Sequence, residues 1–85
     1  MFENKEELKN KIIYRSSYRG SKEMDLLISS FVKSIINNLN YEELLLLSNL
    51  INIDDENLFK LNKKLKTSIN IEDSKFVKLF QNFSI

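Results

Sequence analysis

The residues best suited to directional contacts lie together in the stretch YRSSYRGSKEMD, residues 14–25. This stretch holds both arginines of the chain, Arg15 and Arg19, two of its three tyrosines, and its single glycine, Gly20. All other basic residues are lysines. Arginine offers a planar fork of donors that fits carboxylates, and arginine and tyrosine are enriched in protein interfaces where lysine is depleted. The concentration therefore predicts a surface for protein recognition.

The same stretch also has a purely structural interpretation. If a helix ends near residue 17, basic charge in its last turn is favourable and Gly20 could serve as a left-handed cap. That interpretation explains the glycine, but it explains neither the use of arginine nor the Glu23 that follows at once. We therefore favour an interface, in which a glycine without Cβ permits close backbone approach and Arg19 and Glu23 pair with groups of a partner.

Catalysis has little support in the composition. The chain contains no histidine and no cysteine, so the usual general base, thiolate chemistry and the commonest metal ligands are missing. Paired acids such as Glu42 with Glu43 and Asp54 with Asp55 lie at expected helix starts, where negative charge favours the helix dipole. We therefore expect no enzyme, no metal site and no cofactor of its own.

Length and charge restrict the remaining classes. With 85 residues, 42% of them hydrophobic, we expect one folded domain spanning residues 1–85. A net charge of +1 provides no field to hold nucleic acid or an anionic membrane. The N-terminal sequence MFENKEELKN is charged where a signal peptide would be apolar, and no apolar run reaches about 20 residues, so we expect a cytoplasmic protein without membrane insertion. The high content of lysine, asparagine and isoleucine favours a bacterial source.

Apolar periodicity predicts an all-α fold. Residues 24–39 carry one continuous apolar stripe with helical spacing, and LLLLSNLI at 44–51 is apolar on nearly every side, which suggests a helix packed between neighbours. Ser21, Asn40 with Glu43, and Asp54 fit helix N-caps. Five helices are expected, and together they form a compact five-helix bundle. Their approximate ranges are 4–17, 22 to the asparagines at 37–40, 41–51, 55–65, and 70 or 71 onward through a shared face of Phe76, Leu79, Phe80 and Phe83.

The run Arg19-Gly20-Ser21-Lys22-Glu23, followed by Met24-Asp25-Leu26-Leu27, resembles the Arg-Gly-x-x-Glu motif of the succinate dehydrogenase assembly factors. These small proteins promote covalent flavinylation of the flavoprotein subunit. The similarity extends from about Lys9 to about Gln81, and it includes the helix start at 40–43 and the acidic segment DDENLF at 54–59.

The resemblance implies a five-helix chaperone that has no chemistry of its own. It would act on the FAD of its partner, which becomes joined to a histidine of the flavoprotein subunit, and it would be a monomer when free. The residues implied at the contact are Arg15, Tyr18, Arg19, Gly20, Glu23 and Asp25. Family members often have a second arginine where this chain has Tyr18, and the choice between flavoproteins of succinate dehydrogenase and fumarate reductase stays open.

Two other interpretations stay open beside this one. Arg15 and Arg19 could contact the pyrophosphate of FAD, but the chain has no glycine-rich strand-to-helix turn, so we expect no stable FAD binding. A small helical nucleic-acid-binding module, or another protein-interaction module, is the alternative. Its basic patch would be Lys60, Lys63, Lys64 and Lys66, which lacks the interleaved aromatic residues that stack on bases.

Overall fold

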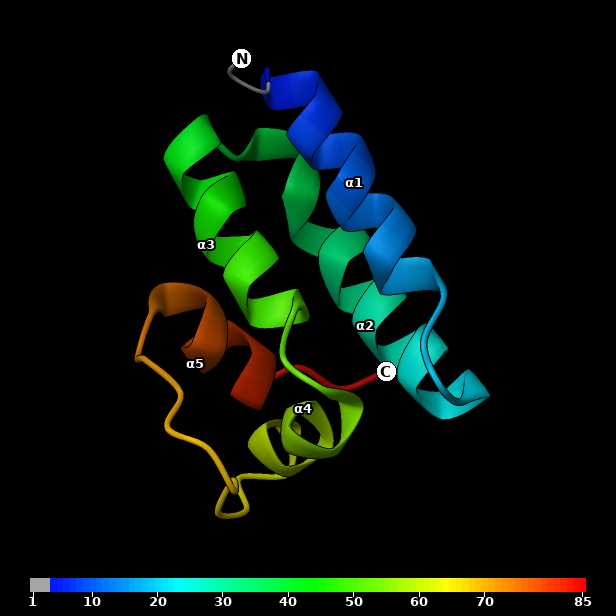
Figure 1. Ribbon diagram of the computed structural model, residues 1–85, viewed down its shortest axis with the longest axis vertical. Helices are drawn as coiled ribbons and strands as arrows, with labels where there is room; N and C mark the ends of the chain where they lie inside the picture. The colour runs from blue at the N-terminus through cyan, green and yellow to red at the C-terminus, as the bar shows by residue number, and fades with distance from the viewer. Residues whose placement is uncertain (1–3) are drawn as a thin grey trace.

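The computed structural model describes residues 4–85 and consists of helices joined by short connections, except for a longer one between Asn62 and Lys75 (Figure 1). No strand occurs within these residues, so the prediction of an all-α, five-helix fold is confirmed. The helices are α1 (Lys5–Ser17), α2 (Lys22–Ile35), the 3₁₀ turn η1 (Ile36–Asn38), α3 (Tyr41–Ile51), α4 (Asp55–Asn62) and α5 (Lys75–Gln81).

The helices are arranged in two groups. α1 packs against both α2 and α3, while α5 packs against α3 and α4. Figure 1 shows α4 and α5 near the lower end of α3, while α1 and α2 lie on the other side of α3 and the start of α2 reaches down to the level of α4. The short turn from α3 to α4 therefore joins the two groups.

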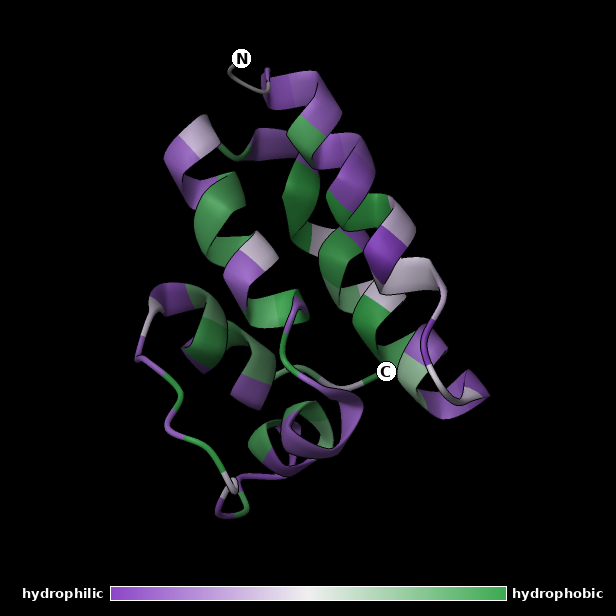
Figure 2. Ribbon diagram, in the orientation of Figure 1, coloured by the Kyte–Doolittle hydropathy of each residue, from purple (hydrophilic) through white to green (hydrophobic). Residues whose placement is uncertain are grey.

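The core lies between these helices. The apolar stripe of α2 is buried as expected, and the largest fully buried side chains include Phe31, Phe76 and Phe80. Figure 2 shows mostly hydrophobic residues along α2 and α3 and mostly hydrophilic residues on α1. As expected for a helix packed between neighbours, α3 contacts α1 and α5, but Leu45 and Leu46 remain 42% and 43% exposed. An 11-residue helix turns one face away from its neighbours even when that face is leucine.

Every one of the five α-helices begins with a side-chain cap. Asn4, Ser21, Asn40, Asp54 and Ser74 each accept a hydrogen bond from the backbone N–H three residues later. Such a bond satisfies one of the free donors of a helix start. The caps fix where each helix begins, so they fix the connections that carry the candidate site.

α4 is shorter than the expected 55–65. It ends at Asn62, and Lys64 then adopts a left-handed conformation with φ of 60°. The Leu65 N–H donates to the Lys60 carbonyl at 2.8 Å and the Lys64 N–H donates to the Leu61 carbonyl at 3.1 Å. This is the hydrogen-bond pattern of a Schellman motif, which normally has glycine at the left-handed position.

α5 begins at Lys75, several residues after the expected Asn70 or Ile71. Ser74 is its cap, and the residues before it run without helical structure, with Ile71 half-buried against the core. Ser68 N–H donates to the side chain of the buried Asn57 at 2.8 Å, which ties this segment to α4. The expected shared face is also only partly present, since Leu79 is exposed while Val77 is buried.

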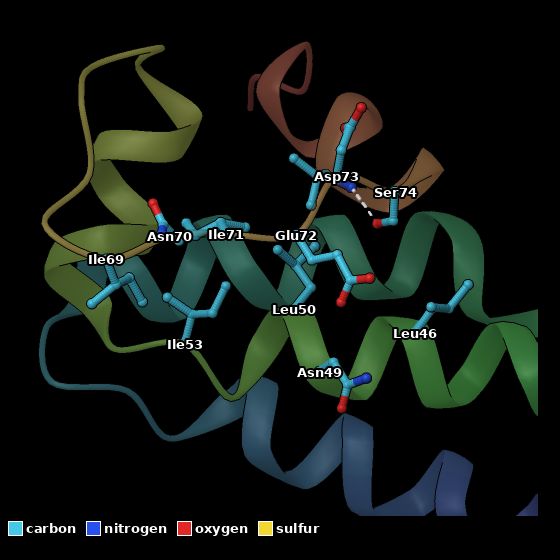
Figure 3. Close-up of a pocket in the computed structure, with 11 residues that line it drawn as sticks. Leu46, Asn49, Leu50, Ile53, Ile69, Asn70, Ile71, Glu72, Asp73 and Ser74 are labelled. Carbon is cyan, nitrogen blue, oxygen red and sulfur yellow. Dashed lines mark hydrogen bonds between the residues drawn. The ribbon is translucent and has the colours of Figure 1, made fainter.

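The extended segment leaves a groove of about 270 Å³ along α3. Figure 3 shows Ile69 and Ile71 on one wall, with Leu50 and Ile53 opposite them. The groove lies between α3 and the segment before α5, so it results from the late start of that helix.

Candidate protein-docking surface

The connection between α1 and α2 is fixed by two carboxylates. Tyr18 is the C-cap of α1 and Ser21 is the N-cap of α2, so only Arg19 and Gly20 lie between the two capping positions. The Arg19 N–H donates to the carboxylate of Asp25 in α2, and the Gly20 N–H donates to Oδ2 of Asp55 in α4 at 2.9 Å. Both backbone donors of the connection are therefore bound within the chain.

The Arg19 side chain points into the protein and joins four segments. Its Nε donates to Asp55 Oδ1 at 2.8 Å, and its Nη2 lies 2.7 Å from the same oxygen. The guanidinium also donates to the backbone carbonyls of Arg15 at 3.2 Å, Ile51 at 2.9 Å and Ile53 at 3.1 Å. Only 12% of the side chain is exposed. A cation here also complements the carbonyl end of α3.

The interpretation of Gly20 as a left-handed cap is wrong. No glycine of the chain has a positive φ, and the left-handed position is at Lys64 instead. A Cβ built on Gly20 would lie 3.2 Å from Asp55 Oδ2, which is a close contact. Glycine is therefore favoured at this position because the Asp55 carboxylate approaches its backbone, and the residue is otherwise exposed.

We call the surface around this connection the motif face. It surrounds an open hollow of about 430 Å³ between the end of α1 and the α3–α4 turn. Tyr14 and Tyr18 are 66% and 72% exposed, and their rings lie 4.9 Å apart. The motif face comprises Tyr14, Arg15, Tyr18, Arg19, Gly20, Ile51, Asn52, Ile53, Asp54 and Asp55.

Some charged side chains on the motif face are in an ion pair and others are not. Arg19 and Asp55 neutralise each other, whereas the exposed Arg15 donates to the neutral Asn52 side chain at 3.0 Å and has no acidic partner within residues 4–85. Hydrogen bonds from the side chain and backbone of Asn57 lower the pKa of Asp54 below its ordinary value. Arg15 and Asp54 therefore present opposite charges to an approaching partner.

Glu23 lies three residues after Gly20, in the first turn of α2, and is exposed. The part of the chain that the structure describes gives its carboxylate no hydrogen bond or ion pair. It lines a second hollow, of about 290 Å³, whose other residues include Phe59, Lys63 and Ile85. Because Asp55 and Phe59 are one turn apart on α4, the two hollows follow the same helix.

The structure brings most of the expected contact residues together. Arg15, Tyr18, Arg19 and Gly20 line one hollow, and Glu23 lines the next. Asp25 is half-buried and accepts from the Arg19 backbone. Sequence reasoning missed Asn52 and Asp55. A signal existed for Asp55: Asp54 alone suffices as the cap of α4, which leaves the second acid without a capping role.

Other kinds of site would involve a metal ion, a membrane or nucleic acid. No group of histidine, cysteine, aspartate or glutamate side chains within residues 4–85 is arranged to hold a metal ion. None of the helices in this range combines the length and hydrophobicity of a membrane span. In the lysine patch, Lys60 pairs with Glu56 at 3.3 Å and the Lys63 ammonium lies 5.8 Å from the centre of the Phe59 ring.

Comparison with protein families places this geometry in context. The family model described as "Flavinator of succinate dehydrogenase" matches residues 10–84, which is most of the chain. The chain belongs to this family. The resemblance noted from the motif is thereby confirmed, and flavinator-family membership gives the chain a role in the assembly of succinate dehydrogenase. Comparison with curated proteins and with solved structures found no match.

Proposed function

We propose that this chain is a cytoplasmic chaperone that binds the flavoprotein subunit of succinate dehydrogenase, or of a related fumarate reductase. It uses the motif face together with Glu23, and binding promotes covalent attachment of FAD to that subunit. The chain is not an enzyme in this role, because it supplies a binding surface and no reacting group. Family membership supports the assembly role, and the surface described above supports the mode of binding.

The observation that carries this proposal is the contrast between a fixed backbone and unsatisfied side chains. Both backbone donors of the α1–α2 connection are held within the chain. Around them, Tyr18 is largely exposed, Arg15 lacks an acidic partner in the described chain, and the Glu23 carboxylate is unpaired there. A rigid backbone with exposed tyrosine, arginine and glutamate is favourable for docking, since little ordering is needed on binding.

The arrangement also supports a role in which FAD remains with the partner. Arg19, one of two arginines that could contact a pyrophosphate, is already bound to Asp55 and to three carbonyls. The chain offers no glycine-rich turn at a helix start for phosphate binding. We therefore propose that the chain holds no cofactor of its own. We also propose that it is a monomer when free.

Co-expression with the flavoprotein subunit tests the proposal. Covalent flavin is followed as fluorescence of the subunit band in a denaturing gel, and complex formation is followed by co-purification. We expect Glu23→Ala to weaken capture, since removing one partner of a desolvated interfacial charge pair costs about 2–5 kcal/mol. Gly20→Arg should abolish both capture and flavinylation while the helical circular dichroism signal is kept.

Glu42→Ala is the matched control for Glu23→Ala. Both residues are exposed acids in the first turn of a helix, but Glu42 belongs to α3 and lines neither hollow of the proposed surface. Its replacement should leave capture unchanged. Normal flavinylation with both Gly20→Arg and Glu23→Ala would contradict the proposed function.

A further inference from the structure

We propose that Asp55 is a positioning residue that holds the docking surface in its binding geometry. The inference rests on the proposed function, and it concerns a residue of α4 outside the Arg-Gly-x-x-Glu motif. Asp55 acts through Arg19 and Gly20, which it fixes to the α3–α4 turn.

The two oxygens of Asp55 have separate tasks. Oδ1 receives the Arg19 Nε–H at 2.8 Å and lies 2.7 Å from Arg19 Nη2. Oδ2 receives the Gly20 N–H at 2.9 Å. One carboxylate therefore binds both the side chain and the backbone of the connection between α1 and α2, and hydrogen bonds of this charge-assisted kind are the stronger ones.

Capping does not account for Asp55. The cap of α4 is Asp54, whose side chain accepts from the Asn57 N–H at 3.2 Å. Asp55 is free to turn toward the connection, where its side chain is 30% exposed and paired with a nearly buried arginine. Its carboxylate is thus engaged between two segments that are 35 residues apart in sequence.

Loss of this carboxylate would release the connection from α4. Arg19 would keep its carbonyl contacts with Ile51 and Ile53, but the Gly20 N–H would lose its acceptor. Gly20, Tyr18 and Glu23 would then sample more than one arrangement relative to the α3–α4 turn. Ordering them again on binding would weaken affinity, which is the cost that preorganisation avoids.

The sharpest variant is Asp55→Asn, which keeps the size of the side chain. An amide offers one acceptor oxygen and one donor NH₂, so either Arg19 or the Gly20 N–H would face a donor instead of an acceptor. Asp55→Ala removes both contacts outright. For each variant the dissociation constant for the purified flavoprotein subunit is measured at a temperature well below the melting temperature of that variant. Exchange of the Gly20 amide proton with solvent is followed by NMR.

Two controls separate positioning from charge and from global stability. Glu56→Gln makes the same acid-to-amide change at the next residue, whose recorded ion pair is with Lys60 on the same helix. Asn40→Ala removes the cap of α3, at the opposite end of that helix from its contact with Arg19. It lowers stability without touching the connection.

We expect both Asp55 variants to raise the Kd about tenfold or more and to lose protection of the Gly20 amide, with both controls within about twofold of wild type. An unchanged Kd for Asp55→Ala would overturn the positioning role, and so would equal weakening by Asn40→Ala. If Glu23→Ala weakens binding while the Asp55 variants do not, only the positioning role fails. If the wild-type chain does not bind the flavoprotein, the proposed function fails with it.

Discussion

Arg19 shows why the chain uses arginine at one buried position and lysine almost everywhere else. Its acceptors, a carboxylate oxygen and three backbone carbonyls, are distributed around the plane of one guanidinium. A lysine ammonium places all its donors on one atom and cannot reach acceptors on several sides. Arginine at this position is therefore required by the fold, whereas the exposed Arg15 is available to a partner.

The first prediction compares the two arginines. Arg19→Lys should lower the free energy of unfolding by about 1.5–3 kcal/mol, because several hydrogen bonds to a charged group are lost at a nearly buried site. Arg15→Lys should change it by less than about 0.5 kcal/mol, as expected for an exposed residue with one hydrogen bond. Urea denaturation measures both, and equal effects would contradict the assignment of Arg19 to the interior.

The second prediction concerns the close contact between Gly20 and Asp55. Because Gly20 has no positive φ, alanine is compatible with its backbone. Gly20→Ala alone would raise the free energy of unfolding by about 0.4–1 kcal/mol, because alanine has less conformational freedom than glycine in the unfolded chain. In the wild-type chain the added Cβ meets Asp55 Oδ2 at 3.2 Å, which opposes that gain.

The gain should therefore appear only after Asp55 is removed. The change in the free energy of unfolding caused by Gly20→Ala should be more stabilising by about 1 kcal/mol in an Asp55→Ala background than in the wild-type chain. Urea denaturation of the four proteins of this double-mutant cycle gives the coupling. Additive effects would show that Asp55 does not restrict the glycine position.

At the scale of elements, the end of α4 offers a third prediction. Lys64 occupies the left-handed position of a Schellman motif, where a side chain costs about 1 kcal/mol. Lys64→Gly should therefore raise the free energy of unfolding by about that amount. Lys63→Gly is the control and should be destabilising, since Lys63 has a φ of −86° and gains nothing from glycine. Thermal melts of the two variants should move in opposite directions.

The start of α3 gives a fourth prediction, on pH. The Asn40 N–H and then Lys75 lower the pKa of Glu43 below its ordinary value of 4.5. A carboxylate whose pKa is lowered by folding contributes stability above its unfolded pKa and loses it as the pH falls through the folded value. Wild-type stability should thus fall below about pH 4.5.

Glu43→Gln isolates the charge in that prediction. Glutamine can still accept from the Asn40 N–H in a capping box, but the ion pair with Lys75 is lost. The variant should be less stable at neutral pH, and its stability should fall less steeply below pH 4.5 than that of the wild type. Urea midpoints measured across this range test both statements, and parallel curves would contradict the role of the charge.

The same elements show what the sequence could predict. The range of α3 and the start of α2 followed from local signals, because caps and apolar spacing act within a few residues. The start of α5 did not follow, because Ile71 packs on the core without being helical, and only tertiary contacts decide this. The end of α4 was missed because a lysine takes the place where glycine is the usual signal.

The candidate site likewise has a part that the sequence could predict and a part that it could not. Exposed residues of the motif face, such as Tyr18 and Gly20, could be predicted from residue type and proximity in the chain. The inward direction of Arg19 could not, since all its acceptors except the Arg15 carbonyl come from residues more than 30 positions later. Pairing between distant segments depends on how the helices pack, which no local pattern contains.

At the scale of the whole molecule, the aromatic cluster of the core is separate from the motif face. The rings of Phe80 and Phe83 lie 5.1 and 5.3 Å from the ring of Phe31, so this aromatic cluster joins α2 to the C-terminal segment. None of these three residues lines the motif face. Variants can therefore remove function by unfolding the protein or by altering its surface, and the two causes are distinguishable.

The fifth prediction uses this separation. Phe80 is fully buried, and Phe80→Ala should cost about 3–5 kcal/mol through lost contacts and the cavity that remains. A domain of 85 residues has a net stability near the lower end of about 5–15 kcal/mol, so this variant should have little stability left at growth temperature.

Tyr18→Ala removes a side chain that is 72% exposed and should leave the melting temperature nearly unchanged. Flavinylation should fall in both, but lowering the temperature should restore it for Phe80→Ala alone, because refolding repairs a stability defect and cannot replace a missing contact. Recovery of both variants on cooling would contradict a docking role for Tyr18.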